Sequence, residues 1–151
     1  IDRDIGQHLR TVLYDALLTH EPKLVREMWS RGQPAWHRVA LAATWPMLRS
    51  RVGAIYGCTS AGVRAAKIAF EACWDALEAR LVDQPYLLGD RFTRVDLTAA
   101  ALLAPLVQPT AHPFAWSPTP PPSLSTFSAH YEDRPLADWV HRIYAAHRHT
   151  R

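Results

Sequence analysis

Apolar residues recur every three or four positions along most of the chain, which is the period of an α-helix, and no run alternates as a half-buried strand would. In the first segment the spacing is four residues: Ile5, Leu9, Leu13 and Leu17. Over residues 63–77 the spacing alternates between three and four, which puts five side chains on one helical face: Val63, Ala66, Phe70, Cys73 and Leu77. Both segments are predicted to be helices packed against a core, with Cys73 as an inert buried thiol.

Prolines and glycines divide the first sixty residues into separate helices. Pro22 lacks the amide hydrogen that a continuing helix needs, so the first helix is predicted to end or restart there. A short second helix is expected to end near Gly32. Pro34 is well placed to open a third helix, which is predicted to reach about Tyr56 with a kink at Pro46. We expect this third helix to have an inner face made of Val39, Ala43, Met47, Val52 and Ile55.

Six of the twelve prolines fall within residues 108–122, a density that a helix cannot hold. This segment is therefore predicted to be an extended loop, and Phe114 and Trp116 within it suggest that the loop packs onto the body. Two short helices are expected after it, the last of them opened by Pro135. Residues 1–151 are thus predicted to form a single all-α domain, a bundle of five to seven helices.

The composition narrows the class of protein. A chain that is 48% hydrophobic and 21% charged is typical of a globular domain and excludes a mostly disordered one. The longest nearly apolar run, Leu97 to Val107, is too short to cross a bilayer. The net charge of +3 comes almost entirely from arginines that are spread along the chain among acids, so we expect neither a nucleic-acid nor a membrane partner.

Little in the sequence points to catalytic or metal chemistry. Cys58 and Cys73 match no common metal or redox motif and fit a reducing, cytoplasmic location. The closest histidines are His141, His147 and His149, which lack the spacing of a zinc-binding helix, so no metal site is expected. Neither a nucleophile elbow nor a phosphate-binding loop is present.

The most informative stretch is Tyr86 to Val107, YLLGDRFTRVDLTAAALLAPLV. Thr93 and Asp96 stand in the spacing of a capping box, in which each side chain accepts a hydrogen bond from the backbone amide of the other residue. Phe92 before the cap and Leu97 after it are placed as a hydrophobic staple. The helix that follows is apolar on every side and is expected to be the central buried one. We interpret Thr93 and Asp96 as structural residues.

This stretch resembles the C-terminal, all-helical domain of cytosolic glutathione S-transferases. In that family a leucine-glycine-aspartate turn precedes an aromatic residue, a Ser or Thr cap, and an Asp that opens a buried helix. The corresponding residues here are Leu88, Gly89, Asp90, Phe92, Thr93 and Asp96. The proline-rich loop and the turn Asp133–Pro135 before the last helix resemble bacterial members, so the resemblance covers most of the chain.

The resemblance implies a function for a longer protein. Family members carry an N-terminal thioredoxin-like domain, whose Tyr, Ser or Cys activates glutathione, and nothing here supplies that domain. We therefore expect the chain to be a fragment or processed form with no catalytic residue and no cofactor, and glutathione to be the co-substrate of the full-length protein. The implied role is to supply a hydrophobic pocket for a small electrophile and part of a homodimer interface, in detoxifying conjugation.

The resemblance also gives candidate pocket residues, because the family's acceptor pocket is lined by the first helix and the C-terminal region of this domain. On that basis the candidates are Tyr14, Leu17 and Trp116, and simple core packing is the competing interpretation.

Two other functions stay open from the sequence. The chain could be a non-catalytic interaction module, since several protein assemblies use this helical domain without catalysis. A hydrophobic-ligand carrier is the third hypothesis, and it predicts ligand binding without glutathione. An upstream thioredoxin-like domain in the same reading frame favours the enzyme, whereas a start codon directly before Ile1 favours the module.

Overall fold

The computed structural model describes residues 2–112 and 121–148, with side chains from Asp4 onward. These ranges are helical, which confirms the predicted all-α class. A π-helical turn, η1 (Asp2–Gly6), precedes the helices α1 (Gln7–His20), α2 (Pro22–Ser30), α3 (Ala35–Ile55), α4 (Ser60–Leu81), α5 (Arg94–Val107), α6 (Pro122–Glu132) and α7 (Pro135–His147). None of the helices in these ranges is long and apolar enough to cross a membrane. Phe114 and Trp116, expected to pack the proline-rich loop onto the body, lie outside the described residues.

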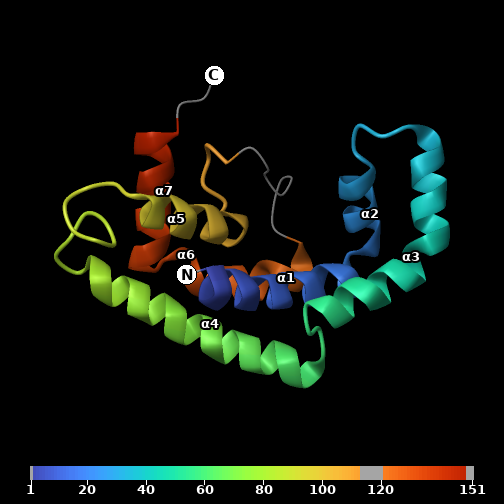
Figure 1. The fold of residues 1–151 in the computed structure, drawn as a ribbon, viewed down its shortest axis with the longest axis horizontal. Helices are drawn as coiled ribbons and strands as arrows, with labels where there is room; N and C mark the ends of the chain where they lie inside the picture. Colours follow the sequence, from blue (N-terminus) through green and yellow to red (C-terminus); the bar gives the residue numbers. More distant parts are fainter. Residues whose placement is uncertain (1, 113–120, 149–151) are drawn as a thin grey trace.

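Most of the helices pack around one core, and we call this part the body: η1, α1 and α4–α7. In Figure 1, α4 runs beside α1, while α5 and α7 lie together near the start of the chain. The fully buried side chains of this core include Phe70, Trp74, Leu103, Trp139 and Val140. The predicted face of α4 is confirmed in its main members, since Ala66, Phe70 and Leu77 are buried and Val63 and Cys73 are half-buried.

The breaks between the first three helices are where the prolines and glycines predict them. The second helix begins at Pro22, and Gly32 adopts a positive φ of 75° in the turn after it. The third helix begins directly after Pro34 and contains Pro46 in its interior. Figure 1 shows that α3 bends sharply along its length, as a proline inside a helix requires.

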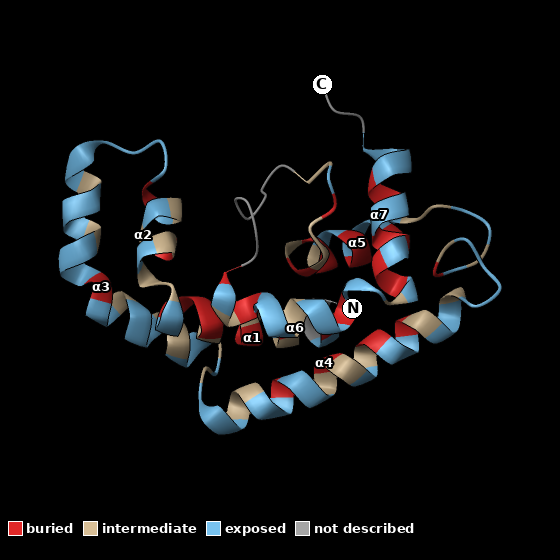
Figure 2. Cartoon of the chain, turned by 180° about the vertical axis from the view of Figure 1, so that it is seen from behind, coloured by how far each residue is buried: buried red, intermediate tan, exposed pale blue. Residues whose placement is uncertain are grey.

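The inner face predicted for α3 is wrong at Val39, Ala43, Met47 and Ile55, whereas Val52 does pack against a core. Val39 and Met47 are 71% and 59% exposed, and Ile55 is exposed as well. The single buried residue of α3 is Trp45, which packs in a second, smaller core with half-buried Leu41 and Val52. The reason is that α2 and α3 extend away from the body as an arm (residues 22–55; Figure 1), and α3 turns its other apolar side toward α1 and α2. Figure 2 shows how little of α3 is buried.

The composition of α5 predicts a helix that is buried on every side, but one side of α5 is exposed. Ala99, Ala100, Leu103 and Ala104 are buried against η1 and α7, but Leu97 is 57% exposed. Thr98 and Ala101 are exposed on the same side. An apolar composition therefore overstates the burial of this helix, because alanine is tolerated equally well on a helical surface.

Candidate functional site

The capping box at the start of α5 is confirmed, and it belongs to a larger buried network. The Thr93 hydroxyl oxygen accepts a hydrogen bond from the Val95 amide at 3.2 Å. One carboxylate oxygen of Asp96 accepts from the Thr93 amide at 2.8 Å and from the Thr93 hydroxyl at 2.7 Å. The other oxygen accepts from the Leu87 amide at 2.7 Å. Because Asp96 is 0% exposed, these donors replace water around the carboxylate, which supports its structural interpretation.

The loop before α5 is held by α7. Gly89 turns the loop with a φ of 110°, and the Trp139 indole donates to the Pro85 carbonyl at 3.0 Å. The Phe92 ring stacks on His147, with 3.9 Å between ring centroids. Phe92 thus packs against α7, and the exposure of Leu97 shows that the expected staple does not bury that leucine.

A second network joins α4 to the start of α7 around Arg134. The guanidinium lies 2.5 Å from a carboxylate oxygen of Glu71, 2.5 Å from Asp75 and 2.6 Å from Glu78. The three acids occupy one face of α4 because they are three or four residues apart. This network was not predicted, although the spacing of the three acids is evident in the sequence.

The neighbours of Glu71 lower the pKa of its carboxyl group. The Tyr131 hydroxyl donates to Glu71 at 2.6 Å and lowers the pKa of that carboxyl, and Arg134 lowers it further against the opposite effect of burial. Burial and the bond to Glu71 both raise the pKa of the Tyr131 hydroxyl. A carboxyl held ionised and a phenol held protonated are suited to fixing α6 and the start of α7 on α4, and poorly suited to exchanging protons near neutral pH.

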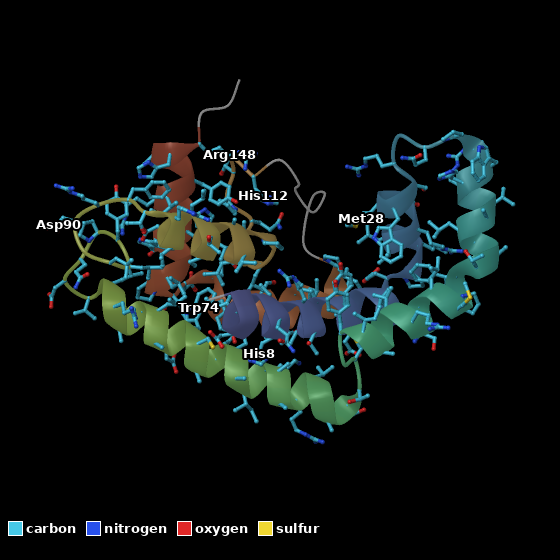
Figure 3. The ribbon with its side chains drawn as sticks, in the orientation of Figure 1. His8, Met28, Trp74, Asp90, His112 and Arg148 are labelled. Carbon is cyan, nitrogen blue, oxygen red and sulfur yellow. The ribbon has the colours of Figure 1, made fainter. Side chains whose placement is uncertain are left out.

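One hollow with an apolar floor, the α1–α4 groove, has a volume of about 620 Å³. It lies between α1, the turn after α3 and α4, and Figure 3 labels His8 on its α1 side. Its floor consists of small or apolar residues: Ala54, Ile55, Gly57, Gly62, Ala65, Ala66 and Ala69. Tyr56 and four polar residues complete the lining: Gln7, His8, Arg10 and Thr11. Apolar walls with a few converging polar groups are typical of small-molecule sites of this size.

The turn at one end of the groove is fixed by close contacts. The Thr11 hydroxyl donates to the Tyr56 carbonyl at 2.8 Å and ties α1 to the end of α3. Gly57 has a φ of 64°, and a side chain at Gly62 would overlap the Gly57 carbonyl oxygen. Thr59 caps α4 by accepting from the Gly62 amide at 3.0 Å. The groove therefore depends on glycine at position 62.

The structure does not bring the three candidate pocket residues together. Leu17 is buried in the second core, so it offers almost no surface to a ligand. Tyr14 is half-buried and stacks on Tyr56, with 4.3 Å between the ring centroids. It therefore contacts a residue that lines the groove but does not line the groove itself. Trp116 lies outside the described residues. Neither Tyr14 nor Leu17 lines the groove, and Tyr56 is one of several lining residues that the sequence did not predict.

A second hollow of about 750 Å³ lies between α4 and α6. Ile68, Phe127 and Tyr131 give it apolar walls, and Lys67 lies 5.6 Å from the centroid of the Phe127 ring. Glu71 and Asp75 at its edge already bind Arg134. This α4–α6 groove is open and mixed in charge.

No thiolate or metal chemistry is assembled in the described part of the chain. Burial raises the pKa of the Cys58 thiol, and nearby Asp15 raises it further. Burial likewise raises the pKa of Cys73. Residues 2–112 and 121–148 contain no group of three side chains able to hold a metal ion, while His149 lies outside them. The raised pKa values favour the protonated form of both thiols.

Comparison with known proteins gives one match. Residues 60–146, more than half of the chain, match the family described as glutathione S-transferase, C-terminal domain. The match spans α4 to α7 and includes both polar networks. Searches of curated proteins and of solved structures find no match.

Proposed function

Since the chain belongs to the glutathione S-transferase C-terminal domain family, we propose that it is the helical half of a glutathione S-transferase-like protein and that its α1–α4 groove binds the acceptor substrate. In this proposal an N-terminal thioredoxin-like domain binds and activates glutathione. The thiolate attacks an electrophilic carbon of the acceptor, a carbon–sulfur bond forms, and the leaving group departs with its electron pair. The cellular role is detoxification in the cytoplasm.

The observation that carries this proposal is the α1–α4 groove itself. Its volume and its floor of alanines suit a small apolar electrophile, and a floor with few hydrogen-bonding groups accepts many shapes. The contribution of such a groove to the rate is to hold the acceptor beside a thiolate, which converts an encounter of two molecules into a reaction within one complex. The raised pKa values of Cys58 and Cys73 support glutathione as the source of the thiolate.

The same proposal places part of a homodimer interface on the outer side of α4. Ile68 is 69% exposed there, at the edge of the open α4–α6 groove. Light scattering after size-exclusion chromatography tests this part: Ile68→Glu should shift a dimer toward the monomer. An Ile68→Glu protein with the parent's mass would contradict this interface.

The first experiment measures glutathione binding by calorimetry for this chain and for the longest protein that its coding region supports. We expect only the longer protein to bind glutathione and to conjugate it to a chlorodinitrobenzene. A longer protein that does not bind glutathione would overturn the enzymatic proposal and favour a scaffold or carrier.

The second experiment tests the groove separately from glutathione binding. Ala65 is exposed and lines the groove, so Ala65→Phe should fill it and raise the KM for the acceptor while leaving glutathione affinity unchanged. Ala76 is exposed on the same helix and lines neither groove, so Ala76→Phe is the matched control. Equal acceptor KM values for the two variants would rule out the groove as the acceptor site.

A further inference from the structure

A further hollow, of about 440 Å³, lies where the second half of α3 runs back toward α1 (Figure 1), and we call it the α1–α3 hollow. The residues that α1 and α3 contribute are each spaced so that they fall on one face of their helix. The full lining is Asp15, Leu18, Thr19, Pro46, Arg49, Ser50, Gly53, Ala54, Cys58 and Thr59. The hollow shares only Ala54 with the α1–α4 groove, so the two are separate sites.

Two side chains of opposite charge line this hollow, Asp15 from α1 and Arg49 from α3. Asp15 is half-buried and Arg49 is exposed. Within residues 2–112 and 121–148 neither of them forms an ion pair, so they do not neutralise each other across the hollow. Burial raises the pKa of the Cys58 thiol in the lining, and the charge of Asp15 raises it further. The Asp15 carboxylate therefore acts on the interior of the hollow.

Hydroxyl groups add to the polar lining. The hydroxyls of Thr19 and Ser50 have no hydrogen-bond partner among the described residues. This differs from the network around Arg134, where every charged group is bound by another side chain. A small molecule in the α1–α3 hollow thus meets an anion, a cation and two hydroxyls that are available for hydrogen bonds.

The two charges distinguish between classes of ligand. A simple anion such as phosphate would be attracted by Arg49 and repelled by Asp15, and a simple cation would meet the reverse. The described part of the chain has no group of three side chains that could hold a metal ion. A molecule with both an ammonium and a carboxylate group pairs with the two side chains at once, and the planar guanidinium suits a carboxylate.

The remaining lining indicates what the rest of the ligand is like. Pro46 and Ala54 are exposed and give the hollow apolar surface on its α3 side. Apolar surface beside a few polar groups that fix orientation is typical of small-molecule sites. An aliphatic side chain on the ligand can therefore pack against α3 while the charged groups bind Asp15 and Arg49.

We infer that the α1–α3 hollow binds a free amino acid with an aliphatic side chain, whose ammonium group pairs with Asp15 and whose carboxylate pairs with Arg49. The hydroxyls of Thr19 and Ser50 supply further hydrogen bonds. The binding is non-covalent and independent of the proposed acceptor site. Glutathione carries two carboxylates against one ammonium, so the half-buried Asp15 disfavours it here.

The test is a titration of the 151-residue chain by calorimetry and ligand-observed NMR, with L-leucine as the probe. N-acetyl-L-leucine keeps the carboxylate but lacks the ammonium group, and L-leucinamide keeps the ammonium group but lacks the carboxylate. We expect leucine to bind and each analogue to bind at least about tenfold more weakly, because each leaves one charged side chain unpaired.

Two conservative variants assign each charge to its partner. Asp15→Asn should weaken leucine binding at least about tenfold and remove the preference for leucine over N-acetyl-leucine. Arg49→Gln should weaken it by a similar factor and remove the preference over leucinamide. Circular dichroism and the Tm check that both variants fold.

Matched controls remove the same charges at other exposed positions. Arg51→Gln changes an arginine on the same helix, and Asp83→Asn changes an acid in the loop after α4. Neither residue lines the α1–α3 hollow or either of the two grooves. Both variants should bind leucine with the affinity of the parent.

Several results would overturn the inference. A folded chain that shows no leucine binding by either method would exclude an amino-acid site. Equal affinities for leucine and its two analogues would exclude pairing with Asp15 and Arg49. A loss in the Arg51 or Asp83 control equal to that in Arg49→Gln or Asp15→Asn would place the bound leucine elsewhere. Displacement of leucine by inorganic phosphate at equal concentration would indicate a general anion site.

Discussion

The body and the α2–α3 arm use apolar side chains in different ways. The body helix α7 has 13 residues and buries six of them, among them Trp139 and Val140, whereas α3 has 21 residues and buries Trp45 alone. Both helices are rich in apolar residues, so composition does not account for the difference. What differs is how much of each helix its neighbours cover: α4 and α5 bury residues along the length of α7, while α1 and α2 bury one residue of α3. The apolar residues of α7 stabilise this fold. The exposed residues Trp36, Val39 and Met47 of α3, which we call its outer stripe, contribute little to it.

Polar residues show the same contrast. In the body, carboxylates are matched to donors from other segments of the chain: buried Asp96 accepts from Leu87 and half-buried Glu71 accepts from Tyr131. On α3 the arginines Arg38, Arg49 and Arg51 are exposed. The comparison therefore predicts that substitutions in the body change the free energy of unfolding strongly. Substitutions in the turn between the arm and the body should have an intermediate effect, and those on the outer stripe almost none.

The largest effect is expected from Asp96→Ala. The substitution leaves the amides of Leu87 and Thr93 without acceptors in a fully buried position, so the free energy of unfolding should fall by about 3 kcal/mol and the Tm by roughly 6–12 °C. Asp90 is exposed in the same loop, so Asp90→Ala should stay within about 0.5 kcal/mol of the parent. Chemical denaturation measures both. A loss below about 1 kcal/mol for Asp96→Ala would mean that the carboxylate is only a local cap.

The junction between arm and body offers the next test. A Cβ at Gly62 would overlap the Gly57 carbonyl oxygen, so Gly62→Ala should cost about 2 kcal/mol. Gly53 is also helical, but its Cβ would meet Cys58 at an ordinary 3.8 Å, so Gly53→Ala should be neutral or stabilising by about 0.5 kcal/mol. Thermal melts of the two variants give the comparison. Equal Tm values would show that the turn after α3 can shift to accommodate a Cβ at position 62 with little loss of stability.

A smaller effect with a pH signature is expected from Arg134→Gln. Three carboxylates lose their cation at a partly exposed site, so the loss should be about 1–2 kcal/mol at pH 7. The pKa of Glu71 is lower in the folded than in the unfolded chain, so its ionised form stabilises the fold above the unfolded pKa, and this stabilisation disappears as the pH falls through the folded pKa. The difference in Tm between parent and Arg134→Gln should therefore narrow below about pH 4. A difference that is constant from pH 7 to pH 3 would contradict the role of the ionised Glu71.

The sequence predicts those features of the body that depend on spacing within one helix. It does not predict the features that depend on contacts between segments. The stripe along residues 63–77 and the pair Thr93 and Asp96 could be predicted because each depends on spacing within one helix. The pairing of Arg134 with α4 joins residues that are distant in sequence, and the bond from Leu87 to Asp96 depends on how the loop folds back onto α5. The spacing of residues within one helix specifies neither of them. For α3 the sequence contains two apolar stripes, and periodicity cannot tell which of them meets the core.

The smallest effect on stability is expected from Val39→Ser with Met47→Ser on the outer stripe. Both side chains are mainly exposed, so the free energy of unfolding should change by no more than about 0.5 kcal/mol for each. In the body, Val140→Ser removes a fully buried valine and leaves a hydroxyl without a guaranteed partner, which should cost at least about 2 kcal/mol. Urea denaturation of the chain measures both. If the stripe variant were as destabilised as Val140→Ser, the stripe would be part of this chain's own core, and the contrast between arm and body would not stand.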